Sequence, residues 1–180
     1  MPLGAARFGL SGADLGKLEL IETQTSTAGT TAFDFTSLGS FNVHFITMTN
    51  MQSTSAENNT AVRVSNDGGS SFETTGYQVA NHTARPVPYQ QRSSSSQHLG
   101  FVTQQNTTTN GNGYYYLYNL LDSGKFTFAT YHGISDQNDI YSTFGSGVYT
   151  TAEVNNAIRV FVNTDSLVAG AVVSLYGIKE

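Results

Sequence analysis

The side chains best suited to chemistry in this chain are its four histidines, and their spacing matches no metal-binding pattern. His44, His82, His98 and His132 never occur as H-x-H or H-x-x-x-H, spacings that let two imidazoles on one element bind zinc. The chain has no cysteine, which excludes disulfides, thiolate metal sites and a cysteine nucleophile. The sequence therefore predicts no bound metal and no cofactor.

Two short segments contain residue types found in catalytic or calcium sites, but not in the required order. His132–Asp136 (HGISD) brings a His, a Ser and an Asp together, yet a serine nucleophile needs a strained turn such as G-x-S-x-G, and Gly145-Ser146-Gly147 lacks that spacing. Asp136–Asp139 offers oxygen ligands for Ca²⁺ without the D-x-[DN]-x-[DN]-G loop and its distal Glu. We predict a turn there, no catalytic residue, and a protein that is not an enzyme.

The segment SNDGGSSF has the composition of a tight turn. Its aspartate can accept hydrogen bonds from turn amides, its glycines supply positive φ, and its phenylalanine can anchor the turn from below. The pattern predicts a hairpin between Ala61–Ser65 and Ser71–Thr74. It also resembles the Asp-box hairpin of sialidase propellers, where the box is scaffold and not catalyst. The residues expected to build the hairpin are Ser65, Asp67, Gly68, Gly69 and Phe72.

A run of tyrosines is the strongest candidate for a binding surface. On a strand, Tyr114, Tyr116 and Tyr118 share one face because successive side chains alternate. An exposed tyrosine face can form an interface hot spot or stack on sugar rings. The rings could equally cover the edge of the domain with their hydroxyls in water.

Residues 1–16 form an N-terminal arm in this interpretation, followed by a single domain over 17–180. The arm is too apolar for a solvated linker and has no strand pattern, and its glycines would let it follow an irregular groove. We predict that it anchors the protein to a neighbouring chain; the alternative is that it folds back on its own domain. Its anchoring side chains would be Leu3, Phe8, Leu10 and Leu15.

Apolar residues recur with a period of two along the rest of the chain, which is typical of β-strands. Phe41–Thr49 is the clearest case, with Phe41, Val43 and Phe45 on one face. Ile158–Val162 and Val168–Tyr176 predict a closing antiparallel hairpin at the edge of a sheet. Asn81–Gln97, which contains two prolines, predicts a long surface loop. About ten short strands indicate an all-β fold, an antiparallel β-sandwich or jelly roll.

The composition limits the partners. Charged residues make up 12% of the 180 residues, about half the usual ~25%, and the net charge is −5. Without a basic stripe we expect no nucleic-acid binding, and without a run of 18 apolar residues no membrane span. Neutral hydroxyls and amides are cheap to desolvate compared with Lys or Glu, which suits a protein that packs against copies of itself.

Four blocks of this sequence resemble small jelly-roll-type β-sandwich proteins of tailed-bacteriophage virions. They are Phe41–Asn50, Arg63–Phe72, Tyr115–Asn119 and Ile158–Lys179 with its ending SLYGIK. The resemblance implies a virion location and a capsid decoration or cement protein, a homotrimer bound to other virion proteins such as the major capsid protein. Two alternatives stay open: a tail-fibre or receptor-binding domain that contacts host glycan, and a free carbohydrate-binding module.

Overall fold

The computed structural model describes residues 16–55, 58–85, 89–105, 107–136 and 140–179. Within these residues the chain forms twelve β-strands and no helix, which confirms the predicted all-β class with two more strands than expected. The strands are β1 (Leu18–Thr25), β2 (Ala32–Phe35), β3 (Val43–Met51), β4 (Asn58–Ser65), β5 (Tyr77–Ala84), β6 (Tyr89–Ser96), β7 (Phe101–Gln105), β8 (Gly111–Tyr118), β9 (Thr127–Asp136), β10 (Ile140–Tyr149), β11 (Ala157–Val162) and β12 (Val172–Ile178).

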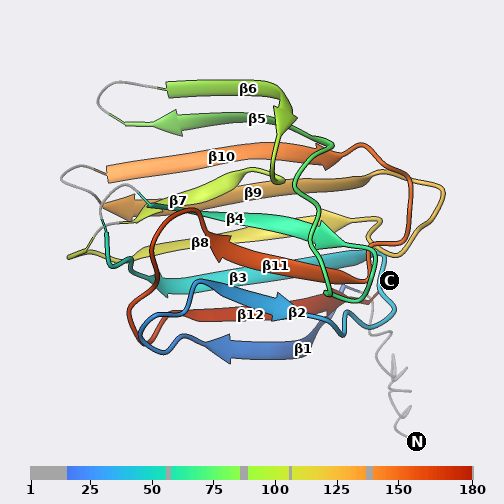
Figure 1. Ribbon diagram of the computed structural model, residues 1–180, viewed down its shortest axis with the longest axis horizontal. Helices are drawn as coiled ribbons and strands as arrows, with labels where there is room; N and C mark the ends of the chain where they lie inside the picture. The colour runs from blue at the N-terminus through green and yellow to red at the C-terminus, as the bar shows by residue number, and fades with distance from the viewer. Residues whose placement is uncertain (1–15, 56–57, 86–88, 106, 137–139, 180) are drawn as a thin grey trace, which may run out of the picture.

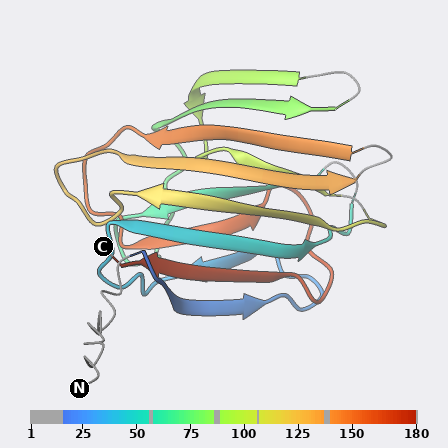
Figure 2. The ribbon, with the colours of Figure 1, turned by 180° about the vertical axis from the view of Figure 1, so that it is seen from behind.

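The strands form two antiparallel sheets packed face to face as a β-sandwich (Figure 1). The larger sheet has eight strands in the order β1-β12-β3-β8-β9-β10-β5-β6, and the smaller has four in the order β2-β11-β4-β7. Seen from behind in Figure 2, the large sheet presents its outer face, with β5 and β6 at one end and β1 at the other. Both sheets are open, so each has two edge strands.

The hydrophobic core fills the space between the two sheets. Strands such as β5 and β9 contribute every second side chain to it, as their alternating burial shows. Fully burying one large apolar side chain is worth roughly 1.5–3 kcal/mol, so this layer is the main force that holds the sheets together. Its members include Ile46, Met48, Leu117 and Leu175 from the large sheet, and Val62, Val64, Ile158 and Val160 from the small one.

The two C-terminal strands do not form a hairpin, so that prediction was wrong. β11 pairs with β2 and β4 in the small sheet, whereas β12 lies between β1 and β3 in the large sheet. The connection between them crosses from one sheet to the other, and the buried Leu167 fills this end of the sandwich. The predicted turn chemistry is present, because Asp165 has a φ of 54°. Its role is to redirect the chain across the core.

The Asp67 loop is built around the aspartate carboxylate as the sequence predicts. Ser71 donates to it twice, from its backbone N–H at 2.9 Å and from its hydroxyl at 2.6 Å, and the Ser65 hydroxyl donates at 2.8 Å. These hydrogen bonds lower the pKa of Asp67 to about 2, led by the Ser71 hydroxyl. Gly68 and Gly69 have φ values of 75° and 89°, in the region that favours glycine.

The second strand of the predicted hairpin is absent. Ser71–Thr74 is not a strand, and it returns to β4 through one backbone hydrogen bond, from Glu73 N–H to the Val64 carbonyl at 2.9 Å. β4 pairs with β11 along one edge, and β7 pairs only with residues 58–61 along the other. At residues 62–65 that second edge binds the Leu99 N–H, the Glu73 N–H and the Tyr77 hydroxyl in place of a paired strand. The loop therefore caps the small sheet instead of extending it.

The segment Asn81–Gln97 is mostly strand and not the predicted surface loop. β5 continues to Ala84 and β6 begins at Tyr89, so the two form an antiparallel pair at the edge of the large sheet. The sequence places its prolines between the strands, at 86 and 88, which lie outside the described residues. The polar composition of β6 suits an edge strand, because the side chains there stay in contact with water and discourage pairing with another sheet.

β3 alternates as predicted, but Phe41 does not share the face of Val43 and Phe45. The strand begins at Val43, and the ring of Phe41 lies over Gly177 and contacts His44 edge to face. His44 is fully buried and its Nε2 donates to the Leu38 carbonyl at 2.8 Å. Burial lowers the pKa of His44, so this imidazole is neutral and structural.

His98 is expected to make the fold sensitive to acid. Burial of its ring, with a smaller contribution from nearby Arg63, lowers the pKa of His98 to about 4, and its Nδ1 accepts a hydrogen bond from the Gly100 N–H at 3.1 Å. Because the unfolded histidine has a pKa near 6.5, the unfolded state binds the proton first as the pH falls. We expect the free energy of unfolding to drop between pH 6.5 and 4 by at most about 3 kcal/mol.

Thermal melts from pH 7.5 to 4 measure this effect in the parent and in His98→Asn. The asparagine Oδ1 takes the place of Nδ1 and can still accept from the Gly100 N–H, but it cannot take up a proton in this range. We expect the variant to lose much of the acid dependence, with the remainder due in part to His44. Equal pH dependence in both proteins would contradict the assignment.

Candidate interaction face

The tyrosine run lies at the centre of the large sheet. On β8, Tyr115 and Leu117 are fully buried in the core, whereas Tyr114, Tyr116 and Tyr118 point outward. The strand register places β8 between β3 and β9, so the outward tyrosines lie in the middle of a broad surface. Their common face is therefore as the sequence predicts, but it is not at an edge of the sandwich.

The outward tyrosines belong to a continuous chain of aromatic rings that crosses six strands. Neighbouring ring centroids are 4.6 to 6.3 Å apart, within the range of favourable aromatic pairs. Five strand spacings of about 4.8 Å give this row of aromatic rings a span of roughly 24 Å. In order, its rings are Tyr176 on β12, Phe45 on β3, Tyr116 and Tyr114 on β8, His132 on β9, Phe144 on β10 and His82 on β5.

Aliphatic side chains extend this surface on both sides of the rings. Leu20 of the edge strand β1 is 56% exposed and lies in register with Tyr176, which in turn pairs with Phe45. A second row of side chains runs parallel to the row of rings and consists of Leu18, Ile178, Val43, Tyr118 and Phe128. We call the outward-facing side chains of the large sheet, which include both rows, the outer aromatic face.

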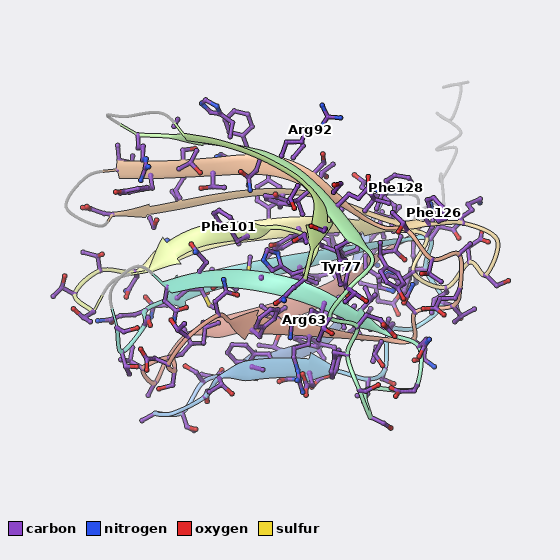
Figure 3. The ribbon with its side chains drawn as sticks, turned by 45° about the horizontal axis from the view of Figure 1, so that its top comes forward. Arg63, Tyr77, Arg92, Phe101, Phe126 and Phe128 are labelled. Carbon is purple, nitrogen blue, oxygen red and sulfur yellow. The ribbon has the colours of Figure 1, made fainter. Side chains whose placement is uncertain are left out.

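The outward face of the small sheet is different and serves as an internal comparison. Its arginines are paired within the chain: Arg159 binds Asp34 through two hydrogen bonds of 2.6 and 2.7 Å and covers the Phe72 ring at 4.1 Å. Arg63, labelled in Figure 3, stacks on Phe161 at 4.4 Å. Among the described strand residues, the exposed large apolar side chains lie on the large sheet only, so the exposure of that face needs an explanation.

The histidines and acids do not converge into a catalytic or metal site. His132 points outward and its Nε2 hydrogen bonds with the Ser142 hydroxyl at 2.8 Å, whereas Ser135 on the same strand is buried on the inner face. Strand alternation thus separates the residues of the HGISD segment. Among the described residues, no group of three or more His, Asp or Glu could hold a metal ion.

Several predicted positions lie outside the described residues. These are the arm side chains Leu3, Phe8, Leu10 and Leu15, and most of the candidate calcium loop Asp136–Asp139. The anchoring role of the arm stays a prediction. No helix in the described part of the chain is long and apolar enough to cross a membrane.

Sequence reasoning found the tyrosines but missed their neighbours on other strands. Phe45 was placed correctly on one face of its strand, yet nothing local indicated that this face points outward. Alternation within a strand likewise does not indicate on which side of a sandwich Leu20, Phe128 and Phe144 lie. The available signal was that both faces of these strands carry apolar residues, which is unusual for an antiparallel sheet with one solvated side.

Comparison with known proteins adds no relative: no protein-family model, curated protein or solved structure matches this chain.

Proposed function

We propose that this protein is a non-enzymatic structural component of a bacteriophage virion, a capsid decoration or cement protein that associates with copies of itself. The observation that carries the self-association is the outer aromatic face, a largely apolar surface on one side of a sandwich whose other side carries Arg63, Arg159 and Asp34. The virion location is supported by the resemblance of four sequence blocks to phage sandwich proteins. The resemblance favours a closed trimer.

The proposed contact is the half of the outer aromatic face on β1, β12, β3 and β8, which we call the assembly half. No residue in it is charged. Two copies, each with a net charge of −5, can therefore meet there without placing like-charged side chains against each other. Like residues can also pack on like, as in other homo-oligomers. The assembly half consists of Leu18, Leu20, Val43, Phe45, Tyr114, Tyr116, Tyr118, Tyr176 and Ile178.

The size of the assembly half fits a modest interface. Four strands about 4.8 Å apart and about 26 Å long cover roughly 500 Å² of flat area, and protruding side chains make the accessible area larger. Weak specific interfaces bury up to about 600 Å² per partner and standard ones about 800 Å². We therefore expect association in the micromolar range, strengthened where a particle lattice aligns the copies.

Leu20→Lys tests the assembly half. Leu20 is exposed in the single chain, so the substitution should leave the fold intact, but it would bury an unpaired ammonium in the interface. We expect the dissociation constant to rise at least about tenfold, equivalent to about 1.4 kcal/mol. The measurement is the molar mass at tens of micromolar by sedimentation velocity or light scattering.

Val154→Lys is the matched control, because Val154 is exposed to 39% but lies in neither sheet. It should associate like the parent. A parent protein that stays monomeric at tens of micromolar, or a Leu20→Lys variant with the mass of the parent, would contradict the proposed contact. Electron microscopy of particles that carry the protein tests the virion location separately.

A further inference from the structure

A second candidate site lies at the opposite end of the large sheet from β1. A shallow cavity of about 250 Å³ opens on the outward side of β9, β10, β5 and β6. It is outside the assembly half, so self-association through that half would leave it open. The side chains that shape it are Gln78, Ala80, Arg92, Ser94, Phe128 and Ser146.

The strand register explains why there is a hollow here. Ser146 on β10 pairs with Ala80 on β5, and Ala80 pairs with Arg92 on β6, so two small side chains lie beside a long one. Phe128 on β9 forms the other wall and is 47% exposed. Figure 3 labels Phe128 and Arg92, which form the two walls of the cavity, and shows Arg92 projecting from β6 at the edge of the sheet.

Arg92 is the most informative residue of the cavity. It is exposed, and it forms no hydrogen bond or ion pair with the rest of the described chain. On the outward face of the large sheet, the other full charge among the described strand residues is Asp136, at the far end of β9 from Phe128. Eight residues of strand separate these two positions by roughly 27 Å, so the acid cannot neutralise the arginine.

We propose that this cavity binds a sugar ring that carries a carboxylate, such as a uronic or sialic acid unit. The guanidinium of Arg92 can hold a carboxylate through two parallel hydrogen bonds. The Phe128 ring offers a negative π face to the C–H groups on one side of the sugar. Gln78, Ser94 and Ser146 supply donors and acceptors for its hydroxyls.

The size and charge of the cavity favour a single acidic ring over other anions. About 250 Å³ is below the 300–1,000 Å³ of sites for drug-sized ligands, so one ring is the fitting ligand. One arginine on a chain with a net charge of −5 is too little positive charge for a nucleic-acid backbone. The inference does not depend on the proposed self-association.

The test is to titrate the full chain separately with glucuronic acid, N-acetylneuraminic acid and glucose. Saturation-transfer NMR monitors binding and gives the dissociation constant of each sugar. We expect the better acidic sugar to bind at least fivefold more tightly than glucose. Arg92→Gln should remove this preference, and Arg92→Lys should keep part of it, because an ammonium retains the charge but not the planar fork. Phe128→Ser should weaken all sugars.

Lys179→Gln is the matched control, because Lys179 is a surface cation paired with Glu19 at the other edge of the sheet. It should bind like the parent. The proposal is overturned if neither acidic sugar binds more tightly than glucose, if Arg92→Gln keeps the preference, or if acetate binds as tightly as the sugar, which would indicate a bare anion site. Since sedimentation of the same variants reports self-association independently, a failure here is distinguishable from a failure of the assembly half.

Discussion

We expect Gly147→Ala to lower the melting temperature by about 6–12 °C, which corresponds to about 3 kcal/mol or more for a domain of this size. Gly147 lies on β10, where the chain leading into β7 crosses the inner face of the large sheet. A β-carbon at Gly147 would overlap the carbonyl oxygen of Leu99 and lie 2.7 Å from its carbonyl carbon. Such a distance is far inside van der Waals contact, so backbone must move.

Neither backbone can move cheaply. Leu99 is fully buried, and its N–H donates to the Val62 carbonyl at 2.9 Å, which ties it to the small sheet. Gly147 pairs on both sides, with Ala129 of β9 and Val79 of β5. Adding one methyl group therefore pushes the two sheets apart. Gly133→Ala should behave in the same way, because its β-carbon would overlap the carbonyl of Val102.

Gly124→Ala is the control for the general effect of replacing glycine. A β-carbon there meets only the Asp122 Oδ1, at 3.4 Å, in the exposed loop between β8 and β9. Its melting temperature should stay close to that of the parent, or rise slightly because alanine restricts the unfolded chain. Thermal unfolding followed by circular dichroism measures all three variants. Equal melting temperatures for Gly147→Ala and Gly124→Ala would show that the close approach does not exist.

We expect Tyr115→Ala to cost about 3–5 kcal/mol and Tyr115→Phe about 1–2 kcal/mol. Tyr115 is fully buried, its ring centroid is 5.1 Å from that of Tyr131, and its hydroxyl donates to the Gly100 carbonyl at 2.8 Å. The alanine variant leaves a cavity of nearly a whole ring. The phenylalanine variant removes only the hydroxyl, which leaves the Gly100 carbonyl without that donor.

Chemical denaturation gives both free energies, and Tyr118→Phe is the control. Tyr118 points outward on the same strand, and its hydroxyl lies 3.3 Å from that of Thr130 at the surface. Its loss should change the free energy of unfolding by less than about 0.5 kcal/mol. If Tyr115→Phe were as stable as the parent, the buried hydrogen bond would contribute nothing. If Tyr118→Phe were the more damaging change, the assignment of faces on β8 would be wrong.

The sequence by itself determined the class of fold and much of the local geometry. A period of two is a property of each strand alone, so it predicted β3 and the shared face of Tyr114, Tyr116 and Tyr118 without knowledge of their neighbours. Turn chemistry is equally local. The hydrogen bond from a turn amide to the Asp67 carboxylate and the positive φ of Gly68 were both predicted, because these residue types favour such turns.

Strand pairing was decided only by the tertiary structure. β11 and β12 follow each other in sequence, but each pairs with distant strands in a different sheet, so the chain crosses the core between them. The same competition for sheet edges removed the hairpin after β4 and placed β6 beside β5. Periodicity within one strand does not indicate which strands pair, because pairing depends on residues far apart in the chain.

The candidate sites also depend on pairing. Local alternation divides a strand into two faces, but only the position of the small sheet decides which face is covered. The outer aromatic face therefore exists because six strands with similar outward residues were brought into register, and the cavity beside Arg92 exists because Ala80 and Ser146 meet across β5 and β10. The sequence supplied the side chains, and non-local hydrogen bonding between strands placed them side by side.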